Sequence, residues 1–547
     1  MGVHEGGRVR LWTPSSLDES VKTMPKCTID GKEIEVAPGT SVIQAADQAG
    51  VRVPRFCYHD DLPVDGNCRM CMVEIEKFPK LQIACGTPVA DGMVVKTQVT
   101  SDKAKEAQKD TLEFLLVNHP IDCPVCDQAG ECYLQDQYMD NGLHDSRTVL
   151  EDKIAKRKVV DIGPILLDAE RCVVCSRCIR YEREVTNTNL LEFVNRGGST
   201  QISTYNGGPI THEYAGNLVD VCPVGALLSK DFRFKMRVWF LKETDSICPG
   251  CSTGCNMTID HRDGEAYRFR PRRNVEVNKS WLCDPGRDLY KNIATGRLTT
   301  AHRTGGAVAA RSELLDEVIS KLQAAGAASA FLATPRASNE DAFAFKKLAE
   351  AVGGRLDFRV GNPQDKVHVH KDQILQREDR HANTQGLLDL GLGVTGVDAL
   401  LADCKAGKVQ VLVLQDGAML QDPGVAGAAR NVPYVAALAT HQGAHLAAVH
   451  ALIPAAMWAE TDGTFTNFDQ RVQRFKRAFE APGEAKPRWE IALDLLARLG
   501  KPLNAATAAD VFVEMTSETK AYADLTHRGL GPKGRLTADR ARAQASA

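Results

Sequence analysis

The chain has 547 residues, of which 43% are hydrophobic and 25% are charged, and its formal net charge is -3. At about 150 residues per domain, this length predicts three to five domains. The small net charge gives no support for binding to nucleic acid or to an anionic membrane surface. No run of about 18 uncharged apolar residues occurs, so we expect no membrane-spanning helix. The longest candidate, Leu446 to Ala459, is interrupted by His450 and Pro454.

The cysteines are the main feature of the composition. Seventeen occur, sixteen of them before residue 284, and only Cys404 follows. The N-terminal residues contain no apolar core of signal-peptide length, so we expect the protein to stay in the compartment where it is made. In a reducing compartment, crowded cysteines are more often metal ligands than disulfide partners. A disulfide-stapled extracellular module is therefore disfavoured.

The first predicted elements follow a loose extension, residues 1–24. The segment CTIDGKEIEV alternates apolar and polar residues around Asp30-Gly31, which predicts a β-hairpin. The next segment, TSVIQAADQAG, predicts a helix with a capping box from Ser41 to Gln44 and a stop at Gly50. Hairpin, helix and a cysteine-containing loop together predict a β-grasp module.

The remaining chain changes character near residue 300. Residues 101–118 predict an amphipathic helix, and two further cysteine-containing segments follow it. After about 300, helical patterns alternate with short apolar runs, which favours βαβ units and a parallel sheet. The Ala-rich, charged end could pack only on a partner. We therefore predict a multidomain chain, α+β and then α/β, divided as 1–24, 25–101, 102–145, 146–245, 246–299, 300–502 and 503–547.

The first cysteine set is Cys57, Cys68, Cys71 and Cys85, spaced C-x₁₀-C-x₂-C-x₁₃-C. This arrangement resembles that of plant-type [2Fe–2S] ferredoxins, with a longer first spacer. A zinc site is the alternative. It prefers paired short spacings, which Cys57 and Cys85 lack, so an iron–sulfur cluster is favoured.

The third set is Cys172, Cys175, Cys178 and Cys222, the last followed by proline. Its C-x₂-C-x₂-C run and closing C-P are typical of bacterial [4Fe–4S] ferredoxins. In two-cluster ferredoxins the C-P cysteine serves the other cluster. Only one such run occurs here, so we expect Cys222 to complete the same cluster.

The fourth set is Cys248, Cys251, Cys255 and Cys283, directly before the α/β region. It resembles the N-terminal cluster-binding segment of molybdopterin oxidoreductases. A zinc ribbon stays open as an alternative, because C-x₂-C with two distant cysteines suits zinc too.

The second set, in the stretch NHPIDCPVCDQAGEC, has only three cysteines: Cys123, Cys126 and Cys132. A four-ligand site therefore lacks one partner. The two unassigned cysteines, Cys27 and Cys404, lie in predicted strand and α/β regions, where cysteine is more often a buried apolar residue. His119, four residues before Cys123, is the favoured candidate, and His59 in the first set's loop is its rival.

The order of these motifs is similar to that in the large iron–sulfur subunits of respiratory complex I, the proton-pumping NADH:quinone oxidoreductases. The resemblance covers about residues 25 to 500 and is most specific over 57–283. In that family the histidine of the second motif is a cluster ligand, which implies this role for His119. The fourth set matches an extra [4Fe–4S] cluster of some bacterial members, which lies off the main electron path. The resemblance therefore implies a bacterial type.

The resemblance also implies cofactors and partners. We expect one [2Fe–2S] and three [4Fe–4S] clusters, with zinc as the alternative at the fourth set. The partners implied are a flavin- and NADH-binding subunit, a small [2Fe–2S] subunit and hydrophilic iron–sulfur subunits on the quinone side. The expected location is peripheral, on the cytoplasmic side of the bacterial inner membrane.

The C-terminal half departs from the family pattern. The segment WAETDGTFTNFDQRVQRFKRAF resembles the end of a molybdopterin domain, yet the stretch between it and Cys283 is shorter than a complete cofactor-binding domain. We therefore expect a scaffold role and no molybdenum. The alternatives are an iron–sulfur chain of a NAD-linked formate dehydrogenase or hydrogenase, and a zinc-stabilised scaffold. No nucleophile constellation or P-loop occurs, so the leading hypothesis is one-electron transfer, with NADH and quinone bound elsewhere.

Overall fold

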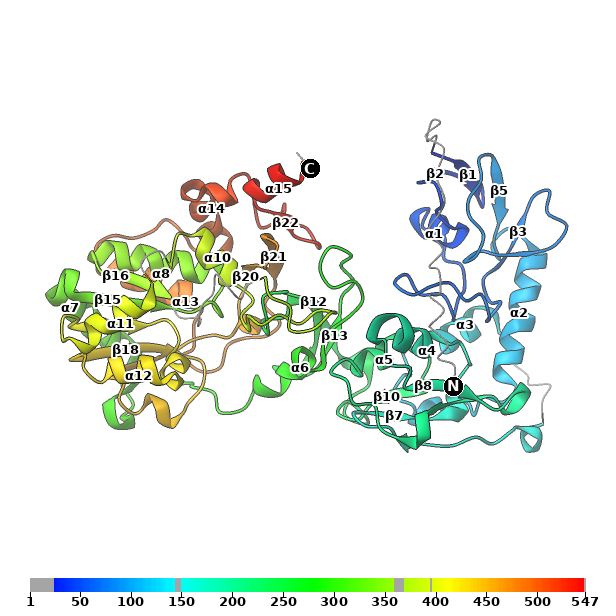
Figure 1. Cartoon of the computed structure of the whole chain (residues 1–547), viewed down its shortest axis with the longest axis horizontal. Helices are drawn as coiled ribbons and strands as arrows, with labels where there is room; N and C mark the ends of the chain where they lie inside the picture. Colours follow the sequence, from blue (N-terminus) through cyan, green and yellow to red (C-terminus); the bar gives the residue numbers. More distant parts are fainter. Residues whose placement is uncertain (1–23, 143–148, 359–367, 394–395, 546–547) are drawn as a thin grey trace, which may run out of the picture.

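The computed structural model describes residues 24–142, 149–358, 368–393 and 396–545. The predicted extension, residues 1–24, lies almost wholly outside them. In Figure 1 the α/β half lies at one end of an elongated molecule and the N-terminal modules at the other. Strands β12 and β13 and helix α6 lie between the two ends (Figure 1).

The N-terminal module is a five-stranded sheet covered by one helix. The hairpin turn is confirmed, because Asp30 (φ 48°) and Gly31 (φ 82°) both adopt the left-handed region of a tight hairpin. The capping box is also confirmed, since the Ser41 backbone N–H donates to Gln44 Oε1 at 3.0 Å. Strands β1 and β5 pair in parallel at the centre of a sheet ordered β2-β1-β5-β3-β4, which is a β-grasp. The elements are β1 (Lys26–Ile29), β2 (Lys32–Glu35), α1 (Val42–Gln48), β3 (Met72–Ile75), β4 (Gln82–Ile83) and β5 (Met93–Lys96).

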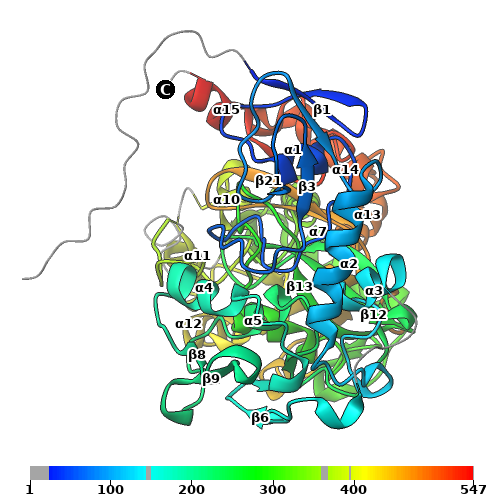
Figure 2. The ribbon, with the colours of Figure 1, turned by 90° about the vertical axis from the view of Figure 1, so that its right-hand side faces the viewer.

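The second module is built on the predicted amphipathic helix. Helix α2 (Asp102–Leu116) begins at Ser101, whose hydroxyl accepts from the Ala104 backbone N–H at 3.2 Å. It buries Ala104, Gln108 and Leu112, which are spaced by four residues along one face. A short 3₁₀ turn (Cys123–Val125) and helix α3 (Tyr133–Asn141) follow. Figure 2 shows α2 running alongside the N-terminal sheet and down to the third module.

Two small modules connect this end to the α/β half. The third contains a three-stranded sheet ordered β10-β7-β6 and the pair β8-β9, and the fourth is an antiparallel sheet ordered β11-β12-β13. The third module's elements are β6 (Val160–Asp161), β7 (Ile165–Leu167), α4 (Arg177–Tyr181), β8 (Leu191–Val194), β9 (Gln201–Thr204), α5 (Gly216–Val221) and β10 (Leu227–Ser229). The fourth module's elements are β11 (Lys242–Ile247), β12 (Asn256–Arg262), β13 (Glu265–Pro271) and α6 (Asp284–Arg287).

The C-terminal half confirms the predicted βαβ pattern. Its sheet is ordered β14-β19-β18-β17-β15-β16 and is parallel except for the edge strand β14. Alternate residues of β15 face opposite layers: Phe331 packs with α7, α8 and α13, whereas Leu332 packs with α11 and α12. The sheet strands are β14 (His302–Arg303), β15 (Ser329–Ala333), β16 (Arg355–Phe358), β17 (Val411–Leu414), β18 (Tyr434–Ala439) and β19 (Ala451–Pro454). The other elements are α7 (Arg311–Ala325), α8 (Asn339–Val352), α10 (Thr384–Asp389), α11 (Val397–Lys405), α12 (Pro423–Ala429), β20 (Gly463–Thr466), β21 (Arg471–Phe475) and α13 (Arg488–Arg498).

The residues after 502 correct one expectation. Helix α14 (Ala508–Glu518) packs on α8 and buries Phe512 and Met515 in the core of the α/β half. Strand β22 (Arg535–Leu536) pairs with β21, and α15 (Ala538–Ala545) ends the described chain. The segment therefore packs on its own chain and not only on a partner. Its high alanine and charge content made this amphipathic helix difficult to recognise in the sequence.

The membrane expectation can be compared directly with the helices. Within the described ranges, no helix is long and apolar enough to cross a bilayer. The apolar run from Leu446 to Ala459 contains the buried strand β19 and no α-helix.

Candidate metal centres

The four cysteines of the first set are brought together at one end of the β-grasp sheet. Cys57, Cys68 and Cys71 lie in and after the loop that follows α1, and Cys85 follows β4. The Cys57 backbone N–H donates to Cys68 Sγ at 3.4 Å. Hydrogen bonds with the Cys68 and Cys85 thiols lower the pKa of Cys57, and contacts with Cys57 and Cys71 raise the pKa of Cys85. The four thiols therefore form one connected group.

The third set is assembled from the loop before α4, from α4 itself, which carries Cys178, and from the end of α5. Burial raises the pKa of Cys172 to about 12 and that of Cys175 to about 11, with further repulsion from neighbouring thiols of the same set. Metal binding would replace these protons, since the thiolate is the ligand form. Val174 (φ 54°) and Ser176 (φ 63°) adopt the left-handed region between the ligands, which is costly for a β-branched residue. This conformation lets the Val174 N–H donate to Cys172 Sγ at 3.3 Å.

The fourth set lies where a hairpin meets a helix start. Cys248 and Cys255 flank the loop between β11 and β12, and the Cys248 N–H donates to the Cys255 carbonyl at 2.8 Å. Cys283 caps α6, and its Sγ accepts from the Gly286 N–H at 3.4 Å. Burial raises the pKa of Cys283 to about 12, with Cys251 as the next contribution. All four predicted residues therefore lie within one neighbourhood.

The second set is brought together only in part. Cys126 and Cys123 interact electrostatically, and so do Cys132 and Cys126. His119 follows α2, and its Nδ1 accepts from the Ile121 N–H at 3.3 Å, which places the proton of a neutral ring on Nε2. Metal binding through Nε2 would require that proton to move to Nδ1. Burial and Lys153 lower the pKa of His119 to about 4, which keeps the imidazole in its neutral, ligating form. Among the described residues, no hydrogen bond joins His119 to a cysteine.

The rival candidates occupy structural positions. His59 stacks on Trp281, with ring centroids 5.5 Å apart, and its Nδ1 accepts from the Asp61 N–H at 3.2 Å. Cys27 is buried in β1 and Cys404 in α11, both within hydrophobic cores. The expectation that these two cysteines are apolar core residues is confirmed.

The first three sets surround a shared hydrophobic cluster. Its centre contains Phe56, Met70, Leu112 and Val224, and cysteines of all three sets contribute to it. The second and third sets also meet directly, because the Tyr133 N–H beside Cys132 donates to the Pro223 carbonyl at 3.0 Å. The fourth set shares a different cluster with Cys178.

Sequence reasoning missed the charged residues beside these sets. Arg171 forms ion pairs with Asp122 at 2.6 Å and with Asp168 at 3.3 Å, next to Cys126. Arg177 and Arg180 are buried within the third set's own segment, SRCIRY. The two arginines on either side of Cys178 could have indicated these buried charges from the sequence, because buried cations need a nearby source of negative charge.

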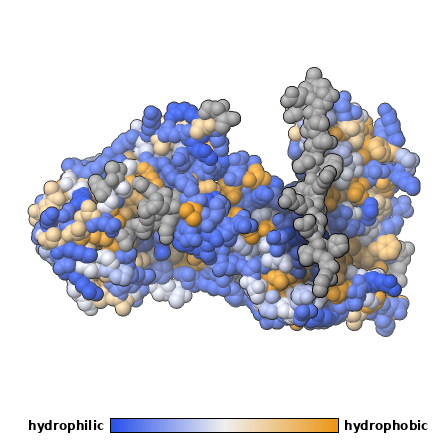
Figure 3. Space-filling model, viewed as in Figure 1, coloured by the Kyte–Doolittle hydropathy of each residue, from blue (hydrophilic) through white to orange (hydrophobic). Residues whose placement is uncertain are grey.

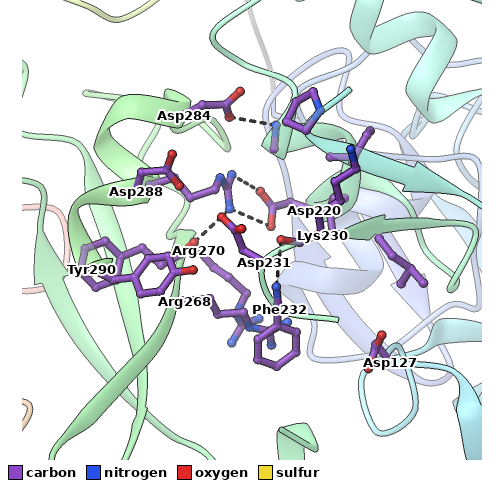
Figure 4. Close-up of a pocket in the computed structure, with 18 of the residues that line it drawn as sticks. Asp127, Asp220, Lys230, Asp231, Phe232, Arg268, Arg270, Asp284, Asp288 and Tyr290 are labelled. Atoms are coloured by element: carbon purple, nitrogen blue, oxygen red, sulfur yellow. Dashed lines mark hydrogen bonds and ion pairs between the residues drawn. The ribbon is translucent and has the colours of Figure 1, made fainter. Parts of the chain in front are cut away.

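A cavity of about 310 Å³, with several charged residues in its lining, lies where the second, third and fourth modules meet (Figure 4). Arg287 pairs with Asp220 at 2.5 Å across it. Asp284 accepts from the Gly216 N–H at 2.9 Å. Arg268 lies over Phe232, 4.1 Å from the ring centroid. These contacts fasten the fourth module to the third.

The donor sets fit iron–sulfur clusters in their chemistry. Three sets offer four thiols, and each of these sets receives at least one backbone N–H on sulfur, an interaction that stabilises cluster-bound thiolates. In the described part of the chain, no three His, Cys, Asp or Glu side chains are arranged to hold a single metal ion. The ligands of a cluster differ from such a group, since they bind different iron atoms.

Five family models match successive segments of the chain. They describe a 2Fe-2S iron–sulfur cluster binding domain (22–100), an NADH-ubiquinone oxidoreductase-G iron–sulfur binding region (108–147), an NADH-quinone oxidoreductase subunit 3 ferredoxin-like domain (163–228), a molybdopterin oxidoreductase Fe4S4 domain (241–295) and a molybdopterin oxidoreductase (379–498). This order confirms the predicted multidomain architecture, with [2Fe–2S]-type and [4Fe–4S]-type binding domains ahead of an α/β domain.

The chain is also similar to curated proteins of the family that the motifs resemble. The G-type subunit of the NADH-quinone oxidoreductase of Streptomyces coelicolor is 41% identical over 340 residues, which are 61% of this chain and 40% of the relative. Its counterpart in Rickettsia bellii is 40% identical over 62% of this chain and 51% of its own. The mitochondrial NADH-ubiquinone oxidoreductase 78 kDa subunit of Candida albicans is 44% identical over 50% and 38%. The predicted resemblance is confirmed, and the chain spans about half or less of the length of these relatives.

One solved structure shows a weaker likeness. An NAD+-reducing [NiFe]-hydrogenase in the H2-reduced state is 27% identical, with a TM-score of 0.35, over 39% of this chain and 91% of the other.

Proposed function

We propose that this chain is the electron-transferring iron–sulfur subunit of a proton-translocating NADH:quinone oxidoreductase, relaying electrons from an NADH- and flavin-binding subunit toward quinone. The observation that carries this proposal is the single hydrophobic cluster to which cysteines of the first three sets all contribute. Iron–sulfur clusters supply one-electron transfer when they are bound. Such transfer needs cluster sites that are closely spaced and lie in a dry, rigid environment.

The ligands we propose are the sixteen residues named from the sequence. They form one [2Fe–2S] site and three [4Fe–4S] sites. The [2Fe–2S] site is Cys57, Cys68, Cys71 and Cys85. The [4Fe–4S] sites are His119 with Cys123, Cys126 and Cys132; Cys172, Cys175, Cys178 and Cys222; and Cys248, Cys251, Cys255 and Cys283. The alignment of the donor sets with the family models supports these assignments.

The surface around the second set supports its role as the exit toward the quinone side. Val125 between the ligands is 56% exposed, and Trp239 beside Gly130 is 58% exposed. Phe114 on α2 is 81% exposed. Hydrophobic side chains reach the surface of this end of the molecule in Figure 3. Exposed aromatic and aliphatic residues beside a ligand set suit a partner protein, here a hydrophilic iron–sulfur subunit.

The other partners and the location follow from the same proposal. The NADH- and flavin-binding subunit and a small [2Fe–2S] subunit would lie on the side of the first set. The complex would be peripheral on the cytoplasmic side of a bacterial inner membrane.

The α/β half is proposed as a scaffold without molybdenum. A cavity of about 510 Å³ lies at the carboxyl ends of β17 and β18, where α/β sheets bind ligands, and Gly250 of the fourth set lines it. This cavity is the one observation that favours the alternative, a formate dehydrogenase chain. Cys404 does not line it, being buried in the core on α11. Metal analysis of the purified complex separates the two, because a formate dehydrogenase of this kind requires molybdenum or tungsten.

Two measurements test the main proposal. Iron and acid-labile sulfide should approach about 14 atoms each per chain, two from one [2Fe–2S] and four from each [4Fe–4S] cluster. Electron paramagnetic resonance of the complex should show reduction by NADH within the turnover time. A colourless, zinc-containing protein would refute the proposal, and so would clusters that NADH reduces only slowly.

A further inference from the structure

Two arginines are buried between the first and third cysteine sets. Arg177 and Arg180 lie on α4, which carries Cys178, and their exposed fractions are only 4% and 8%. Burying a guanidinium cation removes it from water, and nearby dipoles or negative charge must offset that cost.

Both side chains span from one cysteine set to the other through backbone carbonyls. Arg180 donates to the carbonyls of Cys57 and Pro63 in the first set's loop and, at 3.5 Å, to that of Cys175. Arg177 donates to the Tyr58 carbonyl at 2.5 Å and to the Val221 carbonyl at 3.2 Å, next to Cys222. The two arginines therefore fix the spacing between the sets.

Neither arginine forms an ion pair with a carboxylate in the part of the chain that the structure describes. Arg180 reaches Asp65 only through the Ser176 hydroxyl, which accepts from Arg180 Nε at 3.0 Å and donates to the carboxylate. Arg171, beside the second set, has two carboxylate partners. Carbonyl dipoles offset only part of the cost of a buried cation, and a further source of negative charge is needed.

We infer that Arg177 and Arg180 are positioning residues whose positive charges compensate the anionic clusters of the first and third sets and raise their reduction potentials. The inference rests on the proposed function. A cluster held by four thiolates becomes more negative on reduction, so a fixed cation nearby favours the reduced state. Arg180 lies beside Cys57 and Cys175, and Arg177 beside Cys175 and Cys222.

The test is a redox titration of the assembled complex, followed by electron paramagnetic resonance. In Arg180→Gln, the ratio of reduced to oxidised first-set cluster at a fixed potential should fall at least tenfold, which is 59 mV for one electron. In Arg177→Gln, the ratio of reduced to oxidised third-set cluster at a fixed potential should fall by a similar factor. The lysine variants of both residues should stay near the parent, because they keep the charge.

Arg488→Gln is the control for loss of a buried arginine remote from the first and third sets. Arg488 lies in the α/β half, donates to the Gln415 and Ala456 carbonyls at 2.9 and 3.0 Å, and also pairs with Asp416 at 3.4 Å. Its loss should leave the first- and third-set potentials unchanged.

The outcomes separate charge from structure. Loss of clusters in the glutamine variants, with retention in the lysine variants, would support a requirement for charge. Unchanged potentials at full iron content would overturn the inference, and so would loss of clusters in the lysine variants. Reduction by dithionite with mediators reads the potentials whether or not NADH reduces the clusters, so failure of the proposed function remains distinguishable.

Discussion

The sharpest test of the second set is a methyl group added at Gly225. This glycine lies three residues after Cys222, and an ideal Cβ there would lie within 3.0 Å of Cys126 Sγ, closer than real Cβ atoms come to a neighbour. Ordinary contact begins at 3.4 Å, so Sγ must retreat by more than about 0.4 Å, whereas metal–ligand distances tolerate about 0.2 Å. The Cβ would also lie 3.2 Å from Gln128 Cβ, which restricts the direction of escape. Gly225→Ala should therefore displace Cys126 as a ligand, beyond the usual overpacking cost of about 1–3 kcal/mol.

Iron content and electron paramagnetic resonance measure the result. We expect Gly225→Ala to lose about four iron atoms, those of the second set, and to keep the first-set signal. Gly427→Ala is the control, because a Cβ at that position meets nothing within 4 Å. A complete iron complement with an unchanged second-set signal in Gly225→Ala would refute the proposed role of Cys126.

Four further outcomes are expected. His119→Cys should lower the second-set potential, since an anionic thiolate replaces a neutral imidazole; an unchanged or raised midpoint would count against the charge reasoning. Cys404→Ala should keep every iron atom. Because Cys404 is buried, the smaller side chain leaves a cavity, and denaturant titration should show a free energy of unfolding lower by roughly 1–2 kcal/mol. Burial raises the pKa of Asp389 to about 6, so stability should fall as pH rises from about 4 to 6. Asp389→Asn should therefore increase the free energy of unfolding by at most about 3 kcal/mol at pH 7.5 and leave it unchanged at pH 4. Truncation after residue 502 should lower the melting temperature of the α/β half even in the isolated chain, because it removes Phe512 from the core.

Local chemistry explains which elements could be predicted from the sequence. The Asp30-Gly31 turn and the Ser41 cap depend on neighbouring residues only, and both are present. The alternation of helices and strands after residue 300 has a clear period, so the parallel sheet followed from it. Cysteine spacing likewise indicated the first, third and fourth sets, whose members lie close together in the structure, because the C-x₂-C spacing is local.

Long-range contacts account for what the sequence did not reveal. The packing of α14 on α8 joins residues far apart in the chain, and an alanine-rich pattern gives no hint of it. The same holds for Arg177, whose carbonyl partner in Tyr58 lies in another module. The shared cluster of the first three sets is also a tertiary property, and no spacing within one motif predicts it.

The second and third sets differ in the charges that surround them. The third set has four thiols and two nearby arginines without carboxylate partners among the described residues. The second set has three thiols, and its neighbouring Arg171 is more than offset by the carboxylates of Asp122 and Asp168. The fixed positive charge is therefore concentrated beside the set with more thiols. Under the proposed relay, these cations give a third-set cluster a higher reduction potential than its four thiolates alone would allow, because a nearby cation favours the reduced state.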